Sequence, residues 1–260
     1  VMEHYDVRID EEDLSSLPQE EQQRRVEEIR REMSGMARDC FRESLVTVRV
    51  SLLGGERALI HFYSDGLIID GWSLELLMRD MEYFYEAIAR DMPDAPLLFR
   101  NYVEFMESRR HTAEYRKSEA FWLKKIPELP EAPALPMKQT GKGAETIEVC
   151  KHTGTLSKDE WNRFEAACRK FTSFTGLLTA FGEVVGAWSK KKDFCINVPT
   201  FNRMAAGGMA DNTVGECASF FLFAMEHSRS SFIEKAERNR RELALLMEHD
   251  SYTCRERSHR

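Results

Sequence analysis

The sequence lacks the features that mark several broad classes of protein. No apolar run approaches the roughly 18–20 residues that a membrane-spanning helix needs, and the acidic start has no signal-peptide pattern. The seven histidines form no HxxxH or HExxH pattern, so no metal is expected. With a net charge of −7, the chain has no basic surplus for nucleic acid. The expectation is a cytoplasmic protein without a membrane or nucleic-acid partner.

The cysteines also form no recognisable motif. All six are widely spaced and no CxxC pair occurs, which favours buried thiols in a reducing compartment over a disulfide framework or a zinc site. The composition is otherwise ordinary, with 42% hydrophobic and 31% charged residues among 260. That is enough for a packed core in one large domain or two small ones.

Hydrophobic periodicity predicts a mixture of helices and strands. A Gly54–Gly55 pair between two extended runs predicts a hairpin. The predicted helices are 18–40, 74–88, 115–126, 158–171, 174–189 and 232–247, and the predicted strands are 45–53, 56–64, 146–156, 194–202 and 214–226. The helix at 74–88 is expected to face a core with one apolar stripe: Leu74, Leu77, Met81, Phe84 and Ile88. The helix at 158–171 has an apolar set on one face, and the helix at 174–189 carries four apolar residues: Trp161, Phe164, Cys168 and Phe171, and then Leu177, Phe181, Val184 and Trp188.

The clearest break in the chain is PELPEAPALPMKQTGKGAE, residues 127–145. Four prolines followed by a glycine-rich polar stretch cannot sustain a helix or a central strand. We therefore expect a lobe at 1–136, a linker at 137–145 and a second lobe at 146–260. The alternation of strands and helices indicates an α/β or α+β fold.

The stretch HFYSDGLIIDGWSLELLMRD, residues 61–80, places two carboxylates between a predicted strand and a predicted helix. One interpretation is local: Asp65 belongs to a turn, and Asp70 or Ser73 caps the helix. The other is chemical, with a functional site at the strand–loop–helix junction. Spacing alone favours the local interpretation, so the rest of the chain must support the chemical one.

The string SDGLIIDGWS resembles the DxxxxDxxS signature of heterocyclization domains of nonribosomal peptide synthetases, with Asp65, Asp70 and Ser73 at the three fixed positions. Related condensation domains have HHxxxDG at this loop. Three further stretches resemble the family in the same order: the tryptophan-bearing EAFWLKKI with its proline-rich continuation, VPTFNR at 198–203, and VGECASF at 214–220. The resemblance covers nearly the whole chain.

The resemblance implies two chloramphenicol-acetyltransferase-like lobes in a V, with a tunnel between them. Donor and acceptor carrier proteins would deliver acyl groups on phosphopantetheine arms, beside an adenylation domain, and no cofactor would bind directly. The activity implied is an acyl transfer that joins a carrier-bound Cys, Ser or Thr to an upstream acyl thioester. Cyclodehydration to a thiazoline or oxazoline would follow, in secondary metabolism that includes siderophores. Because family members are longer at both ends, we expect this chain to be a fragment with both lobes incomplete.

The resemblance assigns chemistry to Asp65, Asp70, Ser73 and Ser219, and tunnel or structural roles to Trp72, Asn202, Arg203, Glu216 and Ala218. Asp70 is expected to hold the loop, paired with Arg203, whereas Asp65 either shapes the tunnel or touches the substrate. Ser219 is also compatible with a small core residue.

The chain departs from the family pattern in two places. In VGECASF, Glu216 replaces the family's aspartate, and Ala218 replaces a threonine that serves cyclodehydration. About thirty residues further on, Leu246 stands where the family has an acidic residue, although a shift of two would put Glu248 there. Two alternatives therefore stay open beside an active heterocyclization domain. One is a condensation-only acyltransferase, and the other is an inactive docking scaffold.

Overall fold

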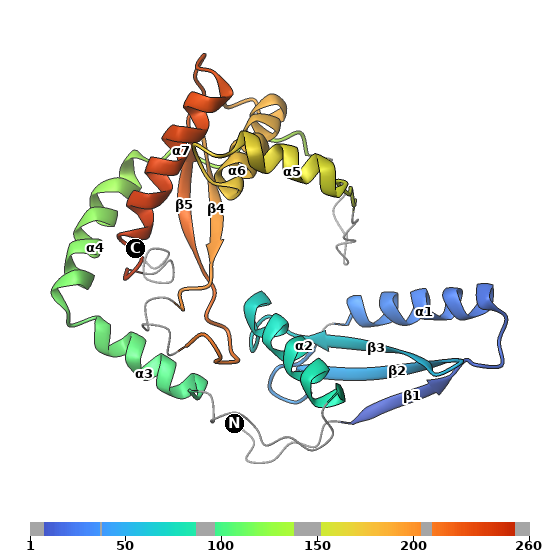
Figure 1. Cartoon of the computed structure of the whole chain (residues 1–260). Coiled ribbons are helices and arrows are strands. Elements are labelled where there is room, and N and C mark those ends of the chain that lie inside the picture. Colours follow the sequence, from blue (N-terminus) through green and yellow to red (C-terminus); the bar gives the residue numbers. More distant parts are fainter. Residues whose placement is uncertain (1–7, 37, 87–96, 138–151, 204–209, 253–260) are drawn as a thin grey trace. The chain divides into compact units, whose positions relative to one another are not determined.

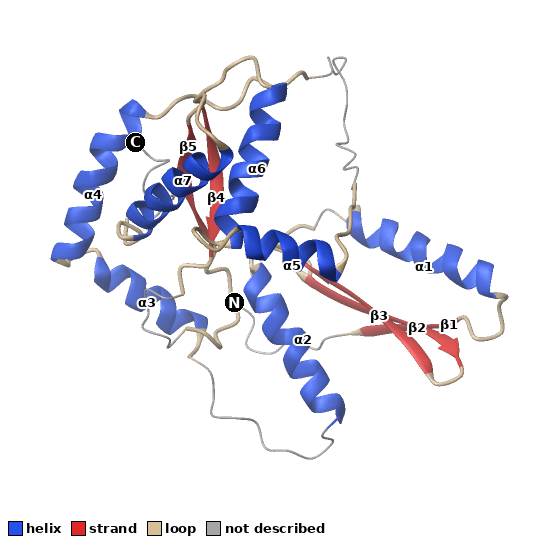
Figure 2. Ribbon diagram, turned by 45° about the horizontal axis from the view of Figure 1, so that its top comes forward, coloured by secondary structure: helices blue, strands red, loops and turns tan. Residues whose placement is uncertain are grey.

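The computed structural model describes residues 8–36, 38–86, 97–137, 152–203 and 210–252 (Figures 1 and 2). The chain forms two compact units, each with helices and strands, so the predicted mixed α/β class is confirmed. Unit 1 contains Val1–Phe99 and the later segment Met209–Cys217, and unit 2 contains Arg100–Gly208 and Ala218–Arg260. The linker expected at 137–145 lies outside the described residues, except for Met137, and the predicted lobe boundaries stay a prediction.

A three-stranded sheet forms the centre of unit 1. β1 (Ile9–Asp13) runs parallel to β2 (Val46–Gly54), and β2 pairs antiparallel with β3 (Arg57–Ser64). The predicted hairpin is therefore confirmed, although its turn lies one residue later than expected, at Gly55 and Glu56. Both residues have positive φ, 60° and 62°, as a two-residue type I′ turn requires.

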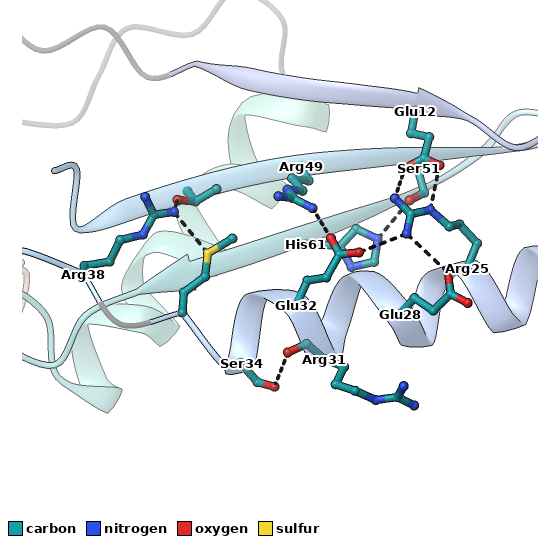
Figure 3. A network of polar contacts seen from close by, with 12 residues as sticks. Glu12, Arg25, Glu28, Arg31, Glu32, Ser34, Arg38, Arg49, Ser51 and His61 are labelled. Atoms are coloured by element: carbon teal, nitrogen blue, oxygen red, sulfur yellow. Dashed lines mark hydrogen bonds and ion pairs between the residues drawn. The ribbon is translucent and has the colours of Figure 1, made fainter. Parts of the chain in front are cut away.

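Helix α1 (Gln19–Ser34) lies over the polar face of this sheet (Figure 3). Arg25 of α1 donates hydrogen bonds to both carboxylate oxygens of Glu12 in β1, at 2.8 and 3.0 Å. Glu32 lies seven residues further along the same helix. Its carboxylate accepts a hydrogen bond from Arg25 at 3.1 Å and another from Arg49 of β2 at 2.8 Å. These ion pairs join the helix to two strands at once.

A buried polar pair lies beneath the same helix. Ser51 of β2 and His61 of β3 are 3.0 Å apart, and their exposed fractions are 0% and 6%. Burial lowers the pKa of His61 below its ordinary value of 6.5, and the nearby charges of Arg30 and Arg49 lower it further. The fold therefore favours the neutral form of His61.

In unit 2, α4 (Ala113–Lys125), α6 (Ser173–Trp188) and α7 (Phe232–Met247) surround an antiparallel pair of strands, β4 (Phe194–Thr200) and β5 (Ser219–Met225) (Figure 1). The core gathers around Trp122, which is 0% exposed and whose indole N–H donates to the carbonyl of His249 at 2.9 Å. The remaining helices are α3 (Phe99–Arg109), the short 3-10 helix η1 (Ile126–Glu128) and α5 (Lys158–Ala167).

Most of the predicted elements of unit 2 are confirmed. The capping box of Ser157 and Glu160 starts α5 as expected, and α7 has the expected bounds. The strand expected over 214–226 begins only at Ser219, because residues 214–217 belong to unit 1. Residues 152–156 are not a strand, and the earlier part of that predicted strand lies outside the described residues.

The core-facing stripe predicted for the helix at 74–88 is wrong, and the apolar residues noted on the helix at 174–189 are exposed as well. On α6 the buried residues are Leu178 and four small ones, among them Gly176 and Gly182. The four apolar residues noted on this helix are exposed: Leu177, Phe181, Val184 and Trp188. On α2 (Gly71–Glu86), which no described element covers extensively, Leu74, Met81 and Phe84 are likewise exposed. Ile88 lies outside the described residues.

Candidate functional site

The loop between β3 and α2 contains the two aspartates. Asp65 follows β3 directly, and its backbone N–H donates to the carbonyl of Leu45 at 2.9 Å. Its Oδ1 accepts from the backbone N–H of Leu67 at 2.9 Å, which is an Asx turn. Among the described residues nothing donates to its Oδ2. The local interpretation of Asp65 as a turn residue is therefore confirmed, and one carboxylate oxygen remains available.

Asp70 has two hydrogen-bonding tasks. Its Oδ1 accepts from the backbone N–H of Ser73 at 2.7 Å, so Asp70, rather than Ser73, caps α2. Its Oδ2 accepts from the backbone N–H of Cys217 at 3.1 Å. Only 6% of the residue is exposed. One buried carboxylate thus starts a helix and holds a segment that lies far along the chain.

Ser73 binds the same distant segment at a second point. Its Oγ donates to the carbonyl of Gly215 at 2.9 Å and accepts from the N–H of Gly215 at 3.0 Å. The residue is 0% exposed. Both capacities of the hydroxyl are therefore used by one backbone residue. These contacts are those of a positioning residue, and the catalytic assignment of Ser73 stays a prediction.

Glycine suits position 215 because the Phe99 ring lies close to its backbone. A Cβ built there would lie 2.1 Å from Cδ2 of the Phe99 ring and 2.6 Å from its Cγ. Any larger residue would force the ring or the backbone to shift. The ring of Phe99 thus presses the backbone of Gly215 from one direction while Ser73 holds it by hydrogen bonds.

Further hydrogen bonds hold residues 211–213 of the same segment. The indole N–H of Trp72 donates to the carbonyl of Asp211 at 3.0 Å, and the hydroxyl of Thr213 donates to the carbonyl of Leu97 at 2.9 Å. Burial then alternates, as in an extended chain. Thr213, Gly215 and Cys217 are buried, whereas Val214, Glu216 and Ala218 are more exposed. We refer to Asp70, Trp72, Ser73 and the bound residues 211–217 as the α2 clamp.

The other expected site residues belong to unit 2. Asn202 has a positive φ of 45° and its carbonyl accepts from the Tyr102 hydroxyl at 3.5 Å. Asn202 and Arg203 are buried, while Ser219 is half-buried at the start of β5, paired with Thr200. The structure thus brings Asp70, Trp72 and Ser73 together with the segment that contains Glu216. The expected pairing of Asp70 with Arg203 stays a prediction.

Sequence reasoning missed the partners within the clamp. Gly215 and Cys217 stand in the stretch VGECASF, but nothing in that stretch indicated that α2 would bind their backbone. The signal is absent because the contacts use backbone atoms, which every residue has. Within the described ranges no group of three or more His, Cys, Asp or Glu could hold a metal ion, and no helix there has the length and hydropathy of a membrane span.

Known proteins resemble this chain in sequence and in fold. Bacitracin synthase 1 of Bacillus licheniformis is 28% identical over 248 residues, which cover 94% of this chain and 5% of that protein. Phenyloxazoline synthase MbtB of Mycolicibacterium paratuberculosis is 28% identical over 217 residues, covering 83% of this chain and 18% of that protein. This chain thus spans a small part of these relatives.

Among solved structures, the EpoB NRPS cyclization-docking bidomain from Sorangium cellulosum is similar with a TM-score of 0.84 and 29% identity. The match covers 96% of this chain and 51% of that chain. The family model described as "Condensation domain" matches residues 1–254. Because that match takes in nearly the whole chain, the protein belongs to the condensation-domain family of nonribosomal peptide synthetases.

Proposed function

We propose that this chain is part of a domain that condenses two carrier-bound substrates and then closes a heterocycle. A carrier-bound Cys, Ser or Thr would attack an upstream acyl thioester, and its side chain would attack the new amide to give a thiazoline or oxazoline. The observation that carries the proposal is the loop with Asp65, Asp70 and Ser73, of which the last two build the α2 clamp. The names of two similar proteins, a phenyloxazoline synthase and a cyclization bidomain, also support ring closure.

The contacts suggest a division of work between the two aspartates. Asp70 has both carboxylate oxygens occupied by backbone donors, so it acts as a positioning residue. Asp65 is half-buried and uses one oxygen in its turn. Asp65 is therefore the better candidate to touch substrate, as the acid or base that dehydration needs. Ser219 is a weaker candidate, because it is a strand residue beside Thr200.

The partners follow from the same proposal. Donor and acceptor carrier proteins would bring both substrates on phosphopantetheine arms, and an adenylation domain would load the acceptor. No cofactor would bind to this chain directly. Trp72, Asn202, Arg203 and Glu216 would shape the path that the arms take.

A condensation-only domain is the second candidate, and Ala218 is the observation that favours it. Amide formation starts from a reactive thioester and a good amine, so positioning supplies much of the acceleration. Ring closure attacks a stable amide and needs placed proton donors. The methyl group of Ala218 donates no hydrogen bond. A third candidate, an inactive docking scaffold, would make neither bond.

The test is a reconstitution with both carrier proteins loaded, in which products are followed by mass. The proposed domain gives a product lighter by one water than the open amide. Replacing Asp65→Asn is expected to lower the dehydrated product by about 10²-fold, the lower range for a lost acid or base. The control is Asp159→Asn on α5, where the carboxylate is exposed.

The three candidates give different results. Open amide alone from the parent identifies a condensation-only domain, and no product at all identifies a scaffold. If Asp65→Asn keeps the parent's yield of dehydrated product, then Asp65 has no part in the chemistry.

A further inference from the structure

A second site lies in unit 2, away from the α2 clamp. A cavity of about 170 Å³ opens where α6 and α7 meet the paired ends of β4 and β5. Its floor is apolar and is formed by Phe194 and Met225, both buried. Gly182 of α6 also lines it, and a Cβ there would lie 2.7 Å from Sδ of Met225. The rim, in contrast, is polar.

The cations on this rim differ in their partners. Lys235 is neutralised, because its Nζ binds both carboxylate oxygens of Glu183 at 2.9 and 3.0 Å. Lys192 donates to a backbone carbonyl, that of Gly186, at 3.0 Å. In the part of the chain that the structure describes, no carboxylate lies within ion-pair distance of Lys192.

Arg238 is the central cation of the rim. Its guanidinium donates to the carbonyl of Glu226 at 3.2 Å and to the hydroxyl of Ser228 at 3.4 Å. Both acceptors are uncharged, and no described carboxylate forms an ion pair with it. A guanidinium has five N–H donors, so these bonds leave further donors for a ligand.

A second hollow of about 310 Å³ adjoins the first and shares Glu226, Arg238 and Asn239 with it. It adds Arg241, which has no carboxylate partner among the described residues either, and a Lys125–Glu242 pair that is closed at 2.6 Å. Three cations without a described carboxylate partner therefore line the two hollows: Lys192, Arg238 and Arg241. Among the described lining residues, the one carboxylate outside the ion pairs is that of Glu226. The two hollows have two positive charges in excess, although the whole chain has a net charge of −7.

We propose that these two hollows form a phosphate-binding site, with Arg238 between them as its principal ligand. The excess of two charges matches a phosphate dianion. The guanidinium fork of Arg238 suits two phosphate oxygens, and Lys192 and Arg241 add charge from either side. The buried amide of Asn239, whose Nδ2 donates to Thr179 at 2.9 Å, fixes the wall between the hollows. Phosphate binding at this site does not depend on the proposed condensation and ring closure.

The experiment titrates the 260-residue chain with inorganic phosphate by calorimetry, with chloride adjusted to keep ionic strength constant. We expect saturable binding to one site. Arg238→Gln should weaken it about 10- to 100-fold, the range for one charge-assisted hydrogen bond. Because Arg238 also holds the loop after β5, Lys192→Gln provides a variant that leaves that loop intact, and it should weaken phosphate several-fold.

The matched control is Arg163→Gln on α5, an exposed arginine that removes the same charge elsewhere on unit 2. It should leave the affinity unchanged. Absence of saturation at millimolar phosphate would overturn the proposal. So would equal weakening by Arg163→Gln and Arg238→Gln, because that result means binding to net charge alone. Acetate at the same ionic strength should not displace phosphate, and displacement would contradict a site for a dianion.

Discussion

Removing one hydroxyl should release the α2 clamp. In Ser73→Ala the N–H and the carbonyl of Gly215 both lose the hydroxyl that they bind. Ser73 is 0% exposed, so the loss falls in a buried site. A buried polar group without a partner costs about 1–3 kcal/mol, so the two together cost about 2–6 kcal/mol. That loss corresponds to roughly 30- to 20,000-fold in a local opening equilibrium.

Amide hydrogen exchange measures this opening directly. In Ser73→Ala we expect the N–H of Gly215 to exchange faster by that factor, followed by that of Cys217 as the segment loosens. Asp70→Ala should give the complementary pattern, with the N–H groups of Ser73 and Cys217 affected first, because Asp70 accepts from both.

The control for the loss of a serine hydroxyl is Ser108→Ala on α3. Its exposed hydroxyl donates to the carbonyl of Phe105 at 2.7 Å, within one helical turn. That variant should leave exchange at residues 210–217 unchanged. Unchanged exchange at Gly215 in Ser73→Ala would refute the clamp, as would equal acceleration in both serine variants.

Three further predictions concern other parts of the chain. Gly215→Ala should lower the free energy of unfolding by about 1–3 kcal/mol through overlap with the Phe99 ring, and a Phe99→Ala background should remove most of that loss in urea titrations; additive effects would contradict the overlap. Because the pKa of His61 is lowered from 6.5, stability should be full above pH 6.5 and fall as the pH drops below it, by at most about 1.4 kcal/mol per pH unit. His61→Gln should flatten this dependence in melts at several pH values, and an unchanged slope would assign it to other groups, His249 included. Ala218→Thr should raise the dehydrated share of product in the carrier assay, and an unchanged share would make Ala218 a neutral variation.

Local signals in the sequence were sufficient for many elements. The glycine pair that includes Gly55 indicates the turn between β2 and β3. The Ser157–Glu160 capping box indicates where α5 starts. Such signals act within a few residues, so a single stretch of sequence contains them. Asp70 as a helix cap was predictable for the same reason.

Burial was harder to predict than the elements themselves. The apolar stripe of Leu74, Met81 and Phe84 shows that α2 has an apolar face, but it does not say what covers that face. On α6 the packed face includes Gly182, where a Cβ would lie 2.7 Å from Sδ of Met225, and periodicity of apolar residues does not reveal such a close approach. The clamp was unpredictable for a related reason, since Asp70 and Cys217 are 147 positions apart and meet through a backbone N–H.

The discontinuity of unit 1 has a consequence for how the protein is made. Its sheet and α1 use residues that leave the ribosome before residues 211–217, whereas the hydrogen-bond partner of Ser73, Gly215, follows 142 positions later. Closing a loop of that length costs about 4 kcal/mol in chain entropy, apart from a constant. We therefore expect the sheet to fold during synthesis while the loop with Asp65 and Asp70 still lacks its distant hydrogen bonds. A nascent chain that stops short of Cys217 contains the strands of unit 1 but not the residues that complete the clamp, so the candidate site is assembled only after Cys217 has been translated.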